Sequence, residues 1–197
     1  MLNNLRYMLQ FLHGGYAKSG MHRLTIVPLL IFFLSCEVPT EAYDNPLDEE
    51  VAEEKGIDTP ALVFFPDKFE DLTAGNSFSV QLFALEMPDV AGAHIQLAYD
   101  KSKISIGNVN AGDFFGSAPI FIYEDDSENG LLNIYTSFLG SDSSATVSGT
   151  GNLATLVLGT ITAGQSTIAY SSESELVDAE DNPVVLNGLG QGEINVQ

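Results

Sequence analysis

From Ala61 onward the chain is built of short runs of β-branched, aromatic and aliphatic residues separated by Gly, Asn, Asp and Ser. Such runs favour strands, and the separating residues are those that turns require. No segment of this region shows the apolar spacing of an amphipathic helix. The predicted strands are 61–65, 78–87, 93–99, 104–109, 120–124, 131–139, 153–161, 166–170, 183–187 and 193–197. Nine or ten strands at this spacing predict an all-β fold of two packed sheets.

The segment Ala91–Ile106 shows the alternation most clearly. Side chains of a strand point alternately to its two faces, so Ile95, Leu97 and Tyr99 are predicted to enter the core. The opposite face then carries Gly92, His94 and Gln96, and the sequence raises the question of what this second face meets.

Residues 1–35 are predicted to contain an export signal. Leu24–Ser35 is almost wholly apolar and follows His22 and Arg23. It is shorter than the roughly 20 residues that span a bilayer, but it has the length of a signal's hydrophobic region. Met21 is the expected start of translation, which implies that the start ahead of it is misassigned.

The only cysteine, Cys36, directly follows this apolar run. Phe33, Leu34 and Ser35 resemble the lipobox of bacterial lipoproteins, which implies that Cys36 is lipidated. The exported protein would then be held on a membrane, facing the cell surface or the periplasm, through its lipid anchor only. The alternative is an ordinary signal peptide with an incidental cysteine.

Residues 36–60 are predicted to form an acidic, disordered linker ahead of a domain at 61–197. The segment is rich in Asp and Glu and contains Pro39 and Pro46, a composition typical of an extended spacer. The alternative is a short helix over residues 48–56, which the like charges at helical spacing oppose.

The charge excludes nucleic acid as a partner. All 27 acidic residues lie beyond Cys36, where the basic residues are only Lys55, Lys68, Lys101 and Lys103. Nucleic-acid binding needs clustered Lys and Arg, and these four lysines are scattered.

Nothing in the exported part predicts an enzyme or a cofactor. His94 is its only histidine and no Gly-x-Ser-x-Gly segment occurs, so zinc and Ser-His-Asp chemistry are not expected. The acidic groups are explained by turns and solvated charge. One weak calcium candidate consists of Asp178, Glu180, Asp181 and Asn182, which offer oxygen ligands without the spacing of an EF-hand loop.

The order of these segments resembles the cohesin module of bacterial cellulosome scaffolds over nearly all of residues 61–197. The matching positions are Gly75 ahead of Phe78–Val80, Tyr99 with Asp100, Gly151 ahead of Leu153 and Ala154, Gly164 ahead of Thr167 and Ile168, the acidic turn 178–182, and Gly192–Val196. The resemblance implies a jelly-roll β-sandwich of about nine strands, without catalysis, that binds a dockerin-like module on another protein.

In cohesins the partner docks on one flat sheet face, and the resemblance carries that role to matching positions. The implied partner-binding residues are Gly92, His94, Gln96, Asn133, Tyr135, Ser137, Thr155 and Val157. An exposed aromatic such as Tyr135 among small polar groups is typical of a binding hot spot. The alternative is that these residues form only the solvated side of an antiparallel sheet.

Three functions stay open at this point. The first is a surface-displayed module that captures a dockerin-bearing protein, linked to polysaccharide degradation. The second is a module that binds carbohydrate directly; the chain has no Trp, and the domain's tyrosines are Tyr99, Tyr123, Tyr135 and Tyr170. The third is a structural spacer at the cell surface.

Overall fold

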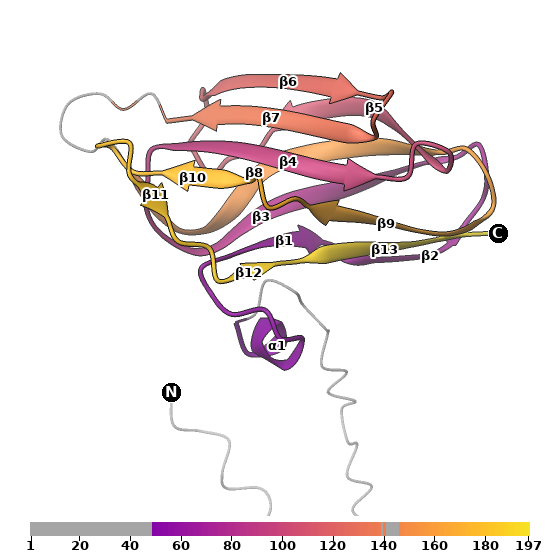
Figure 1. Ribbon diagram of the computed structural model, residues 1–197, viewed down its shortest axis with the longest axis horizontal. Helices are drawn as coiled ribbons and strands as arrows, with labels where there is room; N and C mark the ends of the chain where they lie inside the picture. Colours follow the sequence, from indigo (N-terminus) through magenta and orange to yellow (C-terminus); the bar gives the residue numbers. More distant parts are fainter. Residues whose placement is uncertain (1–48, 139, 141–145) are drawn as a thin grey trace, which may run out of the picture. The chain divides into compact units, whose positions relative to one another are not determined.

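The computed structural model describes residues 49–138, 140 and 146–197, and this part of the chain is nearly all β-structure in two packed sheets (Figure 1). The predicted export signal, the predicted lipidation site Cys36 and the predicted linker up to residue 48 lie outside the described residues. No helix among the described residues is long and apolar enough to cross a membrane. The helix is α1 (Glu49–Glu54), and the strands are β1 (Ala61–Phe65), β2 (Lys68–Leu72), β3 (Ser77–Val90), β4 (Gly92–Tyr99), β5 (Ile104–Ala111), β6 (Ile120–Asp126), β7 (Leu131–Ser137), β8 (Val147–Thr160), β9 (Gly164–Tyr170), β10 (Glu175–Val177), β11 (Pro183–Val184), β12 (Gly188–Leu189) and β13 (Gln191–Val196).

The two sheets are called sheet A and sheet B. Sheet A has five strands in the order β12-β1-β3-β8-β5. Sheet B has eight, and β4 lies at its centre. One edge of β4 pairs with β7 over Gly92–Ala98, and β7 in turn pairs with the edge strand β6. The other edge is shared by β10 and β9, and β9 leads on to β13 and β2.

The core lies between the sheets and confirms the alternation expected from the sequence. Ile95, Leu97 and Tyr99 of β4 are buried, and Leu132 and Ile134 of β7 lie beside them. They pack with Leu82, Leu156 and other aliphatic side chains of sheet A in one cluster. Burial of each such side chain stabilises the fold by about 1.5–3 kcal/mol, so this interior fixes which face of each strand is left outside.

The all-β sandwich is confirmed, although several strands differ from the prediction. Thirteen strands are described where about nine were expected. β2 was missed because Phe69 is its only buried residue among charged neighbours, and the three-residue β10 is too short to show a pattern. Only Pro183–Val184 of the predicted strand 183–187 is formed.

The disordered linker expected up to residue 60 is wrong for its last part. Glu49–Glu54 forms a helix, so the like charges do not prevent one. Ala52 is buried and packs with Ala61 and Val63 of β1 and Leu85 of β3. These side chains project from the outer side of sheet A. This apolar contact provides the stabilisation that the charge pattern alone lacks.

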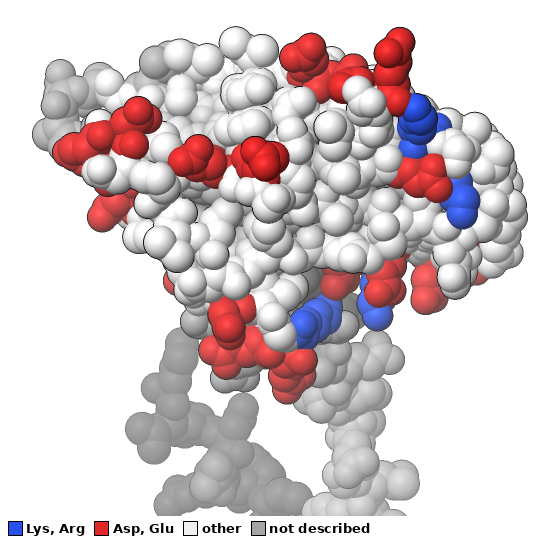
Figure 2. Space-filling view, in the orientation of Figure 1, with Lys and Arg blue, Asp and Glu red and all other residues white. Residues whose placement is uncertain are grey.

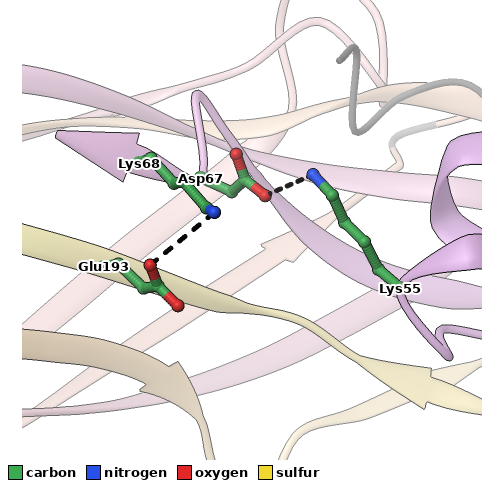
Figure 3. A network of polar contacts seen from close by, with 4 residues as sticks. All are labelled: Lys55, Asp67, Lys68 and Glu193. Carbon is green, nitrogen blue, oxygen red and sulfur yellow. Dashed lines mark hydrogen bonds and ion pairs between the residues drawn. The ribbon is translucent and has the colours of Figure 1, made fainter.

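Polar contacts hold the same junction (Figure 3). Lys55 Nζ lies 2.8 Å from Asp67 Oδ2 and ties the end of α1 to the loop ahead of β2. The Nζ of Lys68 lies 3.9 Å from the Glu193 carboxylate, which links β2 to β13. The ordered domain therefore includes α1 in addition to the predicted residues 61–197.

A tight turn joins β6 to β7 where the sequence Ser-Glu-Asn-Gly predicts one. The N–H of Gly130 donates to the Asp126 carbonyl, and the Gly130 carbonyl accepts from the N–H of Tyr99. Gly130 has a φ of 70°, and a Cβ there would lie 2.4 Å from the Tyr99 carbonyl oxygen. Only glycine fits, because both the backbone angle and the close approach exclude a side chain.

Candidate docking face

The outer face of sheet B over β6, β7, β4 and β10 is called the docking face. Strand register defines its rows, because paired residues project to the same side of a sheet. The central row runs Ile122, Tyr135, His94 and Glu175. The next rows on either side join Ser137 to Gly92 and Asn133 to Gln96. The buried side chains between these positions point inward, so burial in the core determines which side chains of these strands point outward.

An aromatic pair stands at the middle of this face. The rings of His94 and Tyr135 are stacked, with centroids 4.5 Å apart and planes inclined by 5°. Tyr135 is 44% exposed and Ile122, its register partner on β6, is 61% exposed. Stacking restricts both rings before any partner arrives, which lowers the entropy lost on binding.

A chain of hydrogen bonds fixes the polar side chains beside this pair. Asn133 Oδ1 lies 3.1 Å from His94 Nε2 and 3.0 Å from Gln96 Nε2. Gln96 Oε1 in turn accepts from the Ser171 hydroxyl at 2.7 Å. An amide oxygen only accepts, so this network assigns the hydrogen of His94 to Nε2. The imidazole is thus held at Nε2 by Asn133 and across its face by Tyr135.

Six of the eight predicted partner-binding residues therefore come together. They are Gly92, His94, Gln96, Asn133, Tyr135 and Ser137, all on β4 or β7. A Cβ at Gly92 would make ordinary van der Waals contacts with the side chains of Val177 and Ser137, at 3.5 and 3.7 Å. Whether these residues bind a partner stays a prediction.

The structure does not bring Thr155 and Val157 to this face. Both belong to β8, which lies in sheet A between β3 and β5. Their side chains alternate with buried Leu156 and Leu158, so they leave the opposite, outer side of the sandwich. Carrying the partner-binding role to them by position from the cohesin resemblance was wrong, because β8 lies in the other sheet.

Sequence reasoning missed several residues of the face. Ile120 and Ile122 come from β6, which was predicted as a strand but not as a neighbour of β7. Ile120 is 46% exposed. Glu175 comes from the unpredicted β10 and is the register partner of His94. No sequence signal marked Ile120 and Ile122, since isoleucines at alternate positions of a strand ordinarily predict its buried face.

Of Tyr99, Tyr123, Tyr135 and Tyr170, only Tyr135 is exposed on this face. Tyr99 and Tyr170 are buried. The Tyr170 hydroxyl donates to the Val63 carbonyl, and that of Tyr99 to Asp125 Oδ1 at 2.6 Å. Burial, and then the bond to Asp125, hold the pKa of Tyr99 well above its ordinary value. Tyr123 is exposed, but it alternates with Ile122 and so leaves β6 on the other side.

The calcium candidate forms a turn. Asp178 Oδ1 accepts from the backbone N–H groups of Glu180 and Asn182 and from the Asn182 amide. The donation from Asn182 is the main cause that lowers the pKa of the Asp178 carboxyl. In the ranges 49–138 and 146–197, no three His, Cys, Asp or Glu side chains are grouped so as to hold a metal ion.

These observations define a class: a two-sheet β-sandwich that presents one level sheet face with a pre-ordered aromatic and amide centre. The cohesin domain model matches residues 64–196, and the chain belongs to the cohesin family. No curated protein matches the sequence.

Solved structures show the same fold. The cohesin of a type I cohesin–dockerin complex from Clostridium thermocellum has 16% identity and a TM-score of 0.57, covering 70% of this chain and 94% of that one. A type II cohesin from the cellulosome of Acetivibrio cellulolyticus has 15% identity and a TM-score of 0.57, covering 68% and 93%. A non-cellulosomal cohesin from the archaeon Archaeoglobus fulgidus has 15% identity and a TM-score of 0.53, covering 64% and 84%.

Proposed function

We propose that this protein captures a dockerin module of another protein on the docking face. The family supports this, because cohesin domains are non-enzymatic scaffolding modules and the Clostridium thermocellum relative comes from a cohesin–dockerin complex. The observation that carries the proposal is the stacked His94–Tyr135 pair, exposed beside Ile122 and held by Asn133. A rigid aromatic anchor ringed by small polar groups is typical of a binding hot spot.

A wider role is suggested by the export signal and the acidic linker that the sequence predicts. With Cys36 lipidated, the module would be displayed from a membrane and would attach a dockerin-bearing protein there. The attached protein would be a polysaccharide-degrading enzyme. In Figure 1 no described element of the module lies over the docking face, so a partner can reach it. This role requires no catalysis by the chain itself.

The test is titration of each dockerin module encoded in the source genome against the purified protein by calorimetry. At least one should bind, and Tyr135→Ala should weaken that binding by about 2 kcal/mol as a hot-spot truncation does. Thr155→Ala is the matched control, because Thr155 lies on the outer side of sheet A. Its Kd should stay within about twofold.

Two other outcomes separate the alternatives. Retardation of the protein by soluble polysaccharides in affinity electrophoresis, without dockerin binding, would indicate a carbohydrate-binding module. Binding of neither ligand would leave only the role of a spacer. Unaltered dockerin binding by Tyr135→Ala would show that the module uses another surface.

A further inference from the structure

We infer that the docking face selects a partner surface with an apolar centre flanked on two sides by Lys or Arg. This inference rests on the proposed function and gives the chemistry that the dockerin must carry. It follows from where the apolar and acidic side chains stand on the face.

The apolar centre is formed by three exposed side chains. Ile120, Ile122 and Tyr135 are 46%, 61% and 44% exposed, and the stack of Tyr135 on His94 extends the same surface. Register puts Ile122 directly opposite Tyr135, and Ile120 one row away opposite Ser137. Large exposed apolar side chains that adjoin one another mark a surface that a partner covers.

Carboxylates flank this centre on both sides. Glu175 on β10 is the register partner of His94, and Glu173 stands two residues before it. On the other side Glu124 of β6 is the register partner of Asn133. All three are exposed. In Figure 2, which looks onto sheet B, acidic side chains lie over the β10 segment and toward the end of β6, with uncharged surface between them.

The lysines of the described residues engage groups other than these three carboxylates, although Lys101 acts on Asp126 at the end of β6. Beyond Cys36 the chain's only basic residues are these four lysines. Lys55 binds Asp67 and Lys68 lies near Glu193, as Figure 3 shows. Lys101 and Lys103 donate to the backbone carbonyls of Glu128 and Gln165. In the described ranges no ion pair involves Glu124, Glu173 or Glu175, so these carboxylates are available to a Lys or Arg that a partner brings.

Strand spacing sets the distance between the two flanks. β6, β7, β4 and β10 are successive neighbours, so Glu124 and Glu175 are separated by three strand spacings across the sheet and two residues along the strands, or roughly 16 Å. An α-helix that crosses the strands spans this distance in about three turns. The expected partner element thus carries Lys or Arg about nine to eleven residues apart with aliphatic residues between them.

The experiment uses the source-genome dockerin that binds the wild-type protein, with Kd measured at 0.05 M and 0.5 M NaCl. The variants are Glu124→Lys, Glu175→Lys and both together. At low salt each single reversal should weaken binding about tenfold and the double reversal more, because a rim charge changes from attraction to repulsion. Salt should reduce the losses to about twofold, since exposed charges are screened.

A matched control is Glu54→Lys, which makes the same change of net charge at an exposed position of α1, on the sheet A side. Its Kd should stay near the wild-type value, which separates a local contact from a general field. Reversal of a Lys or Arg of the dockerin to Glu should restore binding to the Glu175→Lys variant.

The outcomes separate the two proposals. Equal affinity of the wild-type and reversed proteins for a dockerin would overturn this inference and leave the proposed function standing. Tighter binding of the reversed proteins would overturn it as well. If no source-genome dockerin binds the wild-type protein, both proposals fail.

Discussion

The imidazole of His94 lies flat against the phenol ring of Tyr135, with centroids 4.5 Å apart, although 41 positions of the chain separate the two residues. Antiparallel pairing of β4 with β7 makes them register partners. The pair is thus a product of sheet register, and its exposed surface is fixed before a partner binds.

The stack predicts coupled effects on binding. Tyr135→Ala and His94→Ala should each weaken dockerin binding, and the double variant should lose less than the sum by about 0.5–1.5 kcal/mol, the coupling typical of aromatic pairs. Calorimetry on the four proteins measures it. Tyr135→Phe is the control and should bind nearly as wild type, because the ring is retained. If the losses of binding free energy of the two single variants simply add in the double variant, the two rings do not act together in binding.

Helix α1 should stabilise the domain through Ala52. Ala52→Asp places a carboxylate in the buried contact with Ala61, Val63 and Leu85 and should lower the free energy of unfolding by about 2 kcal/mol or more. Thermal and urea denaturation measure the change. Glu53→Ala, at the exposed neighbouring position, should change stability by less than about 0.5 kcal/mol. Equal stabilities of the two variants would mean that the helix does not dock in solution.

Gly130 tests the turn that brings β7 beside β4. Gly130→Ala should lower the free energy of unfolding by about 2 kcal/mol, because it combines a positive φ with the clash on the Tyr99 carbonyl. Gly116→Ala is the matched control: its φ is 81°, but a Cβ there meets nothing within 4 Å. It should cost only about 1 kcal/mol. The comparison isolates the steric part.

Asp178 predicts a dependence on pH. Its carboxyl has a lowered pKa in the folded protein, chiefly through donation from Asn182, so the charged form is favoured on folding. The stabilisation is present above the ordinary Asp pKa of about 4 and is lost as the pH falls through the lowered folded value. The melting temperature of wild type should exceed that of Asp178→Asn at pH 6–7, and the difference should shrink below about pH 4. A constant difference would contradict this linkage.

The sequence predicts the strands that have one buried and one exposed face. β4 alternates fully, so the inward set Ile95, Leu97 and Tyr99 and the outward set with His94 and Gln96 are confirmed. Alternation works there because one face of β4 packs on a largely apolar core while the other faces outward. The resemblance to cohesins also places β7, and hence Tyr135, in the candidate site.

The remaining features depend on contacts between distant segments. Thr155 and Val157 alternate as cleanly as His94 and Gln96, but their strand joins the other sheet, which no local pattern encodes. Glu175 lies on the face because its strand of three residues pairs with β4, and this pairing cannot be predicted from so short a segment. Helix α1 forms among like charges because Ala52 is buried against apolar side chains of sheet A.

Hydrogen–deuterium exchange of the protein with and without its bound dockerin tests which sheet the partner covers. We expect amides of β6, β7 and β4 to become protected in the complex, while those of β5 and β8 exchange as in the free protein. Protection confined to β5, β8 and β3 would contradict this expectation, because the partner would then sit on the outer side of sheet A, around Thr155 and Val157.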